Sequence, residues 1–561
     1  MQKTCTNCSA SFEITNDDLA FYDRISPVIG GKKFTIPPPT HCPDCRLQRK
    51  IAWRNERYMY KRTCDATGEQ IISMYPPDSP FKIYKQDIWW GDSWNALEYG
   101  REFDFNRPFF EQFRELQVEV PRLALVNKNS ENAQYTNHAS GNKNCYLSAV
   151  TFECEDIYYS DWIIDHSRDL VDCSYMMESC ELCYETYYAW GAYRVFFSEF
   201  MKRCQDAWFC YDCVNCKHCF LCTNLRSKRY CIRNKQYSEE EYEQKIKEIL
   251  PLSHSQLVEY RKDYVQMKEE RAIHQATYQV NTTASSGDLL FNTENCFHCY
   301  DTISSKDCRY CYSVIDVKDS LDIYHVGWAE LMYECHAISN GYKCFACHFT
   351  YDNKNALYCD CTQNCRDVFG CCSLNQKQYC ILNKQYSKEE YESMVPRIIE
   401  HMKKTGEWGE FFPMKYSPFA YNQSRAQEFY LLTKEEAAKK NIKWSEYAPP
   451  EPDVQKVIPA SKLPEHITDT PDDILNWALY CEVSNIPFQL VKQELSFYRK
   501  LDLPVPRRHP NQRYSDRVAM RTPWKMWQRK CNKCHKEIQT TYAPERPETV
   551  YCETCYLAEV Y

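Results

Sequence analysis

Short clusters of aromatic and cysteine residues recur about every twelve positions through the middle of the chain. In a first stretch they lie near residues 145, 157, 170, 181, 194, 208, 218 and 229. Asp, Asn, Ser and Lys separate one cluster from the next, and most of these residue types favour turns. The alternation predicts short β-strands joined by turns.

This pattern is duplicated. KRYCIRNKQYSEEEY starts at Lys228 and KQYCILNKQYSKEEY starts at Lys377, and the second stretch has its clusters near residues 296, 309, 321, 333, 343, 357, 368 and 379. A sustained period of twelve predicts a parallel β-solenoid, in which each coil gains a core by stacking on its neighbours. An antiparallel meander is the competing fold. The NKQYS segment and the Glu-rich helix after it are expected to cap each stack.

The two ends of the chain also match each other. FEITNDDLAFY at 12–22 matches FQLVKQELSFY at 488–498, and RNERYMYKRTC from Arg54 matches RTPWKMWQRKC from Arg521. The predicted fold is mainly β with some α, with one small module at each end of the duplicated repeats. The expected segments are an N-terminal module (1–100), a helical connector (101–143), a first repeat domain (144–237), a helical brace (238–285), a second repeat domain (286–386), a helical and Pro-rich linker (387–470) and a C-terminal module (471–561).

Each module contains paired cysteines at the spacing of zinc ligands. One C-x-x-C turn places two thiolates on an edge of a zinc tetrahedron, and a second turn completes a structural site with no open position. The sequence therefore predicts two structural zinc sites. Their ligands are Cys5, Cys8, Cys42 and Cys45 near the start, and Cys531, Cys534, Cys552 and Cys555 near the end.

Each module also carries an incomplete set at the positions where the other module has its complete one. These positions are Cys64, Thr67, Lys85 and Ile88 in the N-terminal module, and Cys481, Ser484, His509 and Gln512 in the C-terminal module. The complementary loss supports the two complete sets as the working sites.

Residues 5–50, with CTNC, FEITNDDLAFY and CPDCR, resemble the small zinc-ribbon domain found in many bacterial proteins. The whole arrangement, including the closing CNKC and CETCY, resembles a group of bacterial proteins with several such ribbons. The resemblance implies zinc at the two complete cysteine sets and implies no particular activity.

Composition narrows the classes of function. Only 13 residues are Gly, and neither a Walker motif nor a dinucleotide fingerprint is present, which argues against a phosphate-binding loop. No apolar run is long enough for a membrane span and no export signal opens the sequence, so we expect a cytoplasmic protein with no membrane partner. In that compartment the 35 Cys should be metal ligands or buried side chains rather than disulfides.

The densest cysteine row lies in the first repeat stretch, and a further C-x-x-C pair lies in the second. Such a row can supply ligands to an iron–sulfur cluster or to an extra zinc ion, but buried thiols on consecutive coils are the simplest interpretation. An iron–sulfur cluster is disfavoured because the Cys-Pro ending of ferredoxin motifs is absent. The residues are Cys210, Cys213, Cys216, Cys219, Cys222, Cys344 and Cys347.

The net charge of −8 is unevenly distributed, with basic ends and an acidic centre. Guanidinium groups hold phosphates and flat rings stack on unpaired bases, so the basic, aromatic-rich part of each module suits RNA or single-stranded nucleic acid. The alternative is that these cations brace the modules internally. The candidates are Arg46, Arg49, Lys50, Arg54, Arg57, Arg513, Arg517, Arg521, Lys525 and Arg529.

Three hypotheses of function follow. The preferred one is a zinc-stabilised, non-enzymatic scaffold that binds RNA or a ribonucleoprotein. The alternatives are a redox or metal-handling protein that uses the central cysteines, and an enzyme on a solenoid face. The sequence contains neither an HExxH motif nor a nucleophile elbow, so it offers no catalytic residues for the last of these.

Overall fold

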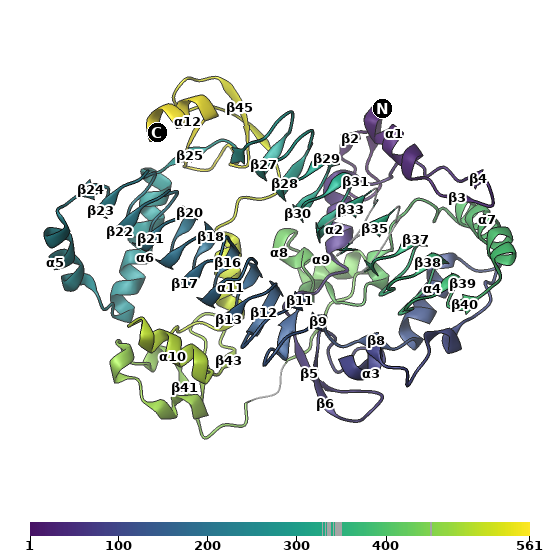
Figure 1. Cartoon of the computed structure of the whole chain (residues 1–561), viewed down its shortest axis with the longest axis horizontal. Helices are drawn as coiled ribbons and strands as arrows, with labels where there is room; N and C mark the ends of the chain where they lie inside the picture. Colours follow the sequence, from purple (N-terminus) through teal and green to yellow (C-terminus); the bar gives the residue numbers. More distant parts are fainter. Residues whose placement is uncertain (328, 331–332, 334–337, 340, 343–349, 449–451) are drawn as a thin grey trace. The chain divides into compact units, whose positions relative to one another are not determined.

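The computed structural model describes the whole chain except residues 328, 331–332, 334–337, 340, 343–349 and 449–451. The chain folds into two compact units, each built from two separate segments. Unit 1 joins Met1–Leu125 to Thr277–Tyr447, and unit 2 joins Val126–Ala276 to Ala448–Tyr561. The N-terminal module therefore belongs with the second repeat stretch, and the C-terminal module belongs with the first (Figure 1).

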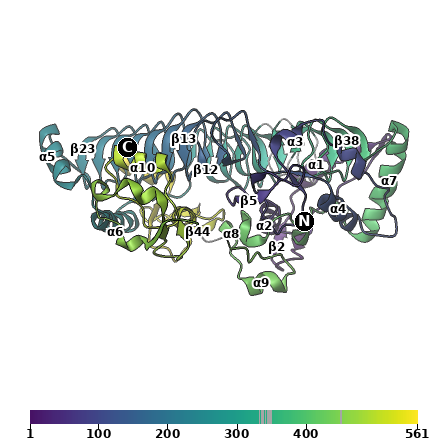
Figure 2. The same cartoon turned by 90° about the horizontal axis from the view of Figure 1, so that it is seen from below.

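Strands of the first repeat stretch form two parallel ladders that alternate along the chain (Figure 2). Twelve residues separate Gln205 from its partner Lys217, and again Lys217 from Arg229. This parallel pairing excludes the antiparallel meander. One ladder contains β13 (Glu155–Tyr158), β15 (Arg168–Val171), β17 (Glu181–Tyr184), β19 (Tyr193–Phe196), β21 (Gln205–Trp208), β22 (Lys217–Phe220) and β23 (Arg229–Ile232). The other contains β12 (Tyr146–Thr151), β14 (Asp161–Ile163), β16 (Ser174–Met177), β18 (Tyr187–Trp190) and β20 (Glu199–Lys202).

The backbone of this stretch turns every three residues. From Arg203 to Arg233, every third residue is left-handed, with φ between 49° and 57°. From Arg203 to Leu221, the residue after each of these positions is buried. The resulting core is filled by thiols and small aliphatic side chains such as Cys204, Ala207 and Cys210. The row from Cys210 to Cys222 is therefore buried as expected. It spans a single repeat of twelve residues, however, whereas we expected its thiols to lie on consecutive coils.

Two helices and the C-terminal module complete unit 2. The helices α5 (Glu239–Ile249) and α6 (His254–Glu270) each begin at a capping box and lie on either side of Pro251. After them, β25 (Ile273–Gln275) pairs with β46 (Thr549–Tyr551) of the C-terminal module. The other elements of that module are β42 (Trp477–Tyr480), β43 (Pro487–Phe488), α10 (Lys492–Lys500), α11 (Pro510–Ala519), β44 (Trp527–Lys530), β45 (Glu537–Thr540) and α12 (Glu553–Val560).

Unit 1 repeats this plan. Its parallel strands include β28 (Cys299–Ile303), β29 (Lys306–Arg309), β30 (Tyr312–Ile315), β31 (Lys318–Leu321), β32 (Tyr324–Gly327), β37 (Lys354–Leu357), β38 (Arg366–Phe369) and β39 (Gln378–Ile381). Successive partners again lie twelve residues apart, as in Tyr300, Tyr312 and Tyr324. The short β40 (Lys384–Gln385) pairs antiparallel with β39. The helix α7 (Lys388–Thr405) comes next and begins at a capping box. The cluster expected near residue 343 lies outside the described residues.

Apart from the hairpin of β3 (Val28–Ile29) and β4 (Lys32–Lys33), the N-terminal module has the same element order as the C-terminal one, which supports their common origin by duplication. Its elements are β1 (Gln2–Thr4), β2 (Ser11–Glu13), α1 (Asn16–Ile25), α2 (Pro43–Ile51), β5 (Tyr60–Thr63), β6 (Gln70–Ser73), β7 (Ile83–Tyr84) and α3 (Gln86–Trp90). In the segment expected to be a helical connector, the chain forms α4 (Phe109–Glu119), with Phe109, Phe113 and Leu116 buried. No helix in the described part of the chain has both the length and the hydrophobicity to cross a membrane.

The narrow core predicts a size limit at Cys213, whose side chain is fully buried. Cys213→Leu should lower the free energy of unfolding by about 1–3 kcal/mol, because added methylenes cannot be fitted without moving the backbone. Urea unfolding followed by circular dichroism measures this change. Cys213→Ala is the control, and a leucine variant as stable as the alanine variant would contradict a tightly packed core.

Candidate metal centres

The first group of four cysteines is built from one turn and one helix start. Cys5 and Cys8 lie in the turn between β1 and β2, Cys42 caps α2, and Cys45 lies in its first turn. The four sulfur atoms lie within 4.8 Å of one another. The Sγ atoms of Cys8 and Cys42 are 3.7 Å apart, close to the edge of about 3.8 Å that a zinc tetrahedron requires.

Polar contacts act unequally on the thiols of this group. The side-chain amide of Asn7 donates to Cys45 Sγ at 3.2 Å. The neighbouring Cys45 thiol lowers the pKa of Cys42 to about 5, and the same contact raises the pKa of Cys45. Metal ions bind thiolates rather than thiols, so binding of a soft divalent ion would release the protons that remain.

The second group repeats this construction in the C-terminal module. Cys531 and Cys534 lie in the turn between β44 and β45, and Cys552 caps α12, which contains Cys555. All four sulfur atoms lie within 4.8 Å of one another, and those of Cys534 and Cys552 are 3.7 Å apart. Burial opposes ionisation of Cys531, but the backbone N–H groups of Cys534 and Cys552 outweigh it and lower its pKa to about 6.

The incomplete sets keep the backbone frame of the complete ones. The backbone N–H of Lys85 donates to Cys64 Sγ at 3.4 Å, just as the N–H of Cys552 donates to Cys531 Sγ at 3.3 Å. In the other incomplete set, the N–H of Ser484 donates to Cys481 Sγ at 3.4 Å. The folds of both incomplete sets therefore persist although their ligands are lost.

The central cysteines form no comparable cluster in the described part of the chain, where only the two terminal groups bring three or more ligand atoms within 4.8 Å. Burial raises the pKa of Cys210, whereas neighbouring thiols lower the pKa of Cys216 and Cys222. The lack of a cluster among the described residues is therefore the observation that disfavours a metal site in this row. Cys344 and Cys347 lie outside the described residues.

The basic helix α2 of the N-terminal module directs its cations into unit 1. Arg46 Nε lies 2.9 Å from Asp322 Oδ2, and both side chains are 2% exposed. Lys50 is fully buried and donates to the backbone carbonyl of Asp322, while Arg49 lies 2.8 Å from Glu410. Burial opposes the charge of Arg46, but Asp322 outweighs it and raises the pKa of the guanidinium well above its usual value.

Helix α11 makes the equivalent contact in unit 2. Arg513 Nη1 lies 2.6 Å from Asp172 Oδ2, and Arg517 Nη1 lies 2.8 Å from Asp172 Oδ1. Arg513 also lies 3.3 Å from Glu494, and all four side chains are buried.

These two contacts are duplicates of each other. Arg513 occupies the position of Arg46 in the module alignment, and Asp172 and Asp322 occupy matching positions 150 residues apart in the two repeat stretches. Neither aspartate was predicted from the sequence. The signal that could have revealed them is this joint duplication of a basic position in the modules and an acidic position in the repeats.

The other basic candidates differ in exposure. Arg54 is buried beside Glu56, and Arg521 donates to Tyr175 Oη at 3.0 Å. Arg57 and Arg529 are half-buried, and Lys525 alone among the ten candidates, all of which the structure describes, is exposed. Most of these cations therefore bond within their own unit and are not available to phosphates.

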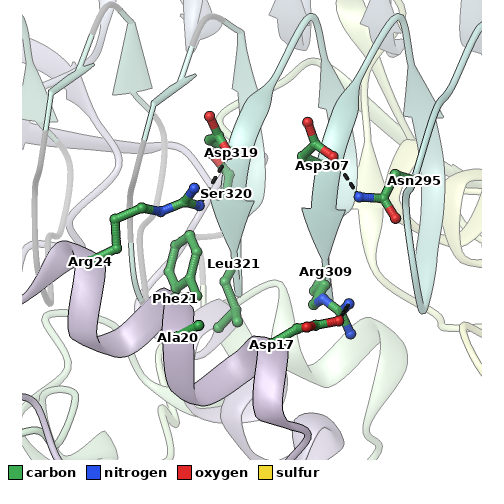
Figure 3. Close-up of a pocket in the computed structure, with 10 residues that line it drawn as sticks. All are labelled: Asp17, Ala20, Phe21, Arg24, Asn295, Asp307, Arg309, Asp319, Ser320 and Leu321. Carbon is green, nitrogen blue, oxygen red and sulfur yellow. Dashed lines mark hydrogen bonds and ion pairs between the residues drawn. The ribbon is translucent and has the colours of Figure 1, made fainter.

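An open pocket of about 460 Å³ lies where α1 meets the repeats of unit 1 (Figure 3). Four of its charged groups form two pairs: Arg24 lies 3.1 Å from Asp319, and Arg309 lies 2.7 Å from Asp17. The fifth, Asp307, accepts from the side-chain amide of Asn295. The pocket therefore marks the seam between the module and the repeats, and two ion pairs cross that seam.

Comparisons with protein-family models, with curated proteins and with solved structures found no match to this chain. The likeness to zinc ribbons accordingly depends on the two groups of four cysteines.

The retained frame around Cys64 predicts that its lost site can be rebuilt. The triple variant Thr67→Cys, Lys85→Cys, Ile88→Cys should bind one more zinc ion per chain than the unchanged protein, because four thiolates then occupy the frame. Elemental analysis after dialysis measures the metal content. Adding Cys64→Ser to the triple variant should abolish the gain, and a triple variant with unchanged metal content would show that the frame has been lost.

The shared carboxylate of Asp172 predicts a large loss of stability on neutralisation. Asp172→Asn removes the carboxylate that two buried guanidinium groups share and leaves Glu494 beside only one of them, which should cost about 3–5 kcal/mol of unfolding free energy. Urea denaturation of the whole chain measures it. The control is Glu155→Gln, which removes the exposed Lys143–Glu155 pair of 2.9 Å and should cost no more than about 1 kcal/mol. Equal losses in the two variants would contradict the role assigned to Asp172.

Proposed function

We propose that the protein is a zinc-stabilised, non-enzymatic scaffold that binds another macromolecule. The observation that carries the proposal is that the terminal cysteines are arranged as structural metal ligands. Each terminal cysteine group offers four thiol ligands and so leaves no open coordination position for a substrate. A cytoplasmic location is part of the proposal, because reduced thiols persist there.

We further propose that each pair of ladders is a parallel β-solenoid. The regular step of twelve residues, the left-handed residue at every third position and the single inward side chain per tripeptide support this. Such a stack offers a long regular surface, which is the usual binding element of repeat proteins.

Zinc would act in this scaffold by holding the modules against the repeats. In unit 2, α12 carries Cys555 and also Tyr556, whose hydroxyl donates to Asp212 of the repeat stretch. Asp212 is buried and lies 3.0 Å from Arg226. Loss of the metal would release α12 and remove one partner from this buried carboxylate.

RNA remains the proposed partner of the C-terminal module, although fewer basic residues are exposed for it than the sequence suggested. Lys525 is exposed, and its Nζ lies 5.1 Å from the centre of the Trp527 ring. A cation beside an aromatic ring suits a phosphate and an unpaired base.

The test is native purification of the tagged, zinc-loaded chain from its source cells. We expect a macromolecule to co-purify in fixed ratio, and to be lost from a Cys8→Ser, Cys534→Ser variant. If the partner is RNA, the absorbance ratio at 260 and 280 nm should fall after nuclease treatment, and Lys525→Glu should weaken retention where Lys262→Glu does not. A chain that purifies without any partner at low salt would contradict the proposal.

A further inference from the structure

We propose that residues 234–238, the NKQYS segment that ends the first repeat stretch, bind an acidic polypeptide segment of a partner protein. This inference deepens the scaffold function proposed above and rests on it. The chain contains the same five residues at 383–387, and in unit 1 that second copy already holds such a segment.

The occupied copy is bound through the backbone of residues 96–102. The side-chain amide of Asn383 donates to the carbonyl of Ala96 at 3.1 Å, and the N–H of Arg101 donates to the carbonyl of Leu382 at 3.1 Å. Between these bonds, the chain passes so closely that a Cβ on Gly100 would lie 2.7 Å from the carbonyl oxygen of Asn383. Residues Ala96–Tyr99 form one 3-10 turn, and the backbone is extended at Gly100. Backbone bonds and a required glycine indicate recognition of a polypeptide in this conformation.

A carboxylate completes the occupied copy. Tyr386 Oη donates to Glu102 at 2.8 Å, and Lys384 Nζ donates to the same carboxylate. These bonds, that of Lys384 first, lower the pKa of Glu102. The bound sequence therefore has the form Gly-x-Glu, with the glycine against the backbone and the acid against the lysine and tyrosine.

The copy in unit 2 has the same framework and is open. Its β24 (Lys235–Gln236) pairs with β23 as β40 pairs with β39. Asn234 Oδ1 accepts from the N–H of Thr223 at 2.9 Å, as Asn383 Oδ1 accepts from Cys372 at 2.8 Å. Asn383 is fully buried, whereas Asn234, Lys235 and Gln236 are exposed.

The charge around the open copy favours an acidic occupant. Residues 226–235 contain five Lys or Arg and no acid. Arg226 pairs with Asp212 and Arg233 pairs with Asp263, so the basic character of the open copy depends on the other three. Lys228 and Arg229 are exposed, and the second of these is replaced by Gln378 at the matching position of the second stretch. The open copy is therefore more basic than the one that binds Glu102.

The test uses a fluorescein-labelled peptide with the sequence of residues 94–105 and the full, zinc-loaded chain. We expect saturable binding by fluorescence anisotropy below about 1 mM. Lys235→Glu should weaken it at least about tenfold, and a peptide with Glu102→Lys should bind this variant better than it binds the unchanged protein. Lys262→Glu, an equal change of charge on α6, should have no effect.

Changes in the peptide cannot unfold the protein, so they keep the test decisive. A peptide with Gly100→Val should not bind, because its side chain meets the backbone. Absence of saturable binding, or binding that Lys235→Glu leaves unchanged, would overturn the inference. Loss of binding with Lys384→Glu alone would also overturn it, because the peptide would then be displacing residues 96–102 in unit 1. Binding of an oligouridylate in place of the peptide would overturn it as well. Failure here with a partner still co-purifying would refute this site and not the scaffold function.

Discussion

A buried carboxylate in each repeat stretch requires a cation that the stretch itself does not supply. Asp322 meets Arg46, and Asp172 meets Arg513 and Arg517. A buried charge without its partner costs several kcal/mol. Each repeat stretch is therefore completed by a module from a distant part of the chain, and each module by a repeat stretch.

The two units attach their metal groups to this contact in different ways. In unit 1, α2 carries both Arg46 and two of the four cysteine ligands, so one helix serves the metal group and the buried ion pair. In unit 2, α11 carries Gln512 of the incomplete set, whereas two cysteines of the complete set lie at the start of α12, where Tyr556 bonds to Asp212. A metal ion would therefore support the central ion pair directly in unit 1 and a second, separate contact in unit 2.

The sequence predicted the parts that depend on local spacing. The two groups of four cysteines come together, and the predicted clusters near 157, 170, 181, 194, 208, 218 and 229 lie on or beside the strands of one ladder. The second ladder was missed because its left-handed corners are formed by residues such as Phe209 and Asp212 rather than glycine. Glycine is the usual sign of such corners, and the chain has only 13 Gly.

The partners of the basic residues could not be predicted because they depend on long-range contacts. Nothing near Arg46 in the sequence distinguishes a guanidinium that will meet a phosphate from one that will meet Asp322. The burial of both side chains decides the matter, and burial follows from the docking of module on repeat. In the sequence, only the joint duplication of the basic and acidic positions indicates that these two residues are partners.

The interleaved order of the segments has a consequence for synthesis of the protein. Arg46 leaves the ribosome 276 residues before Asp322, an interval of about 15–55 s at bacterial or eukaryotic elongation rates. Throughout that time the cationic helix of the nascent N-terminal module must stay solvated or be bound by a chaperone. The first repeat stretch waits longer still for Arg513, so neither unit can mature while the polypeptide is only half made.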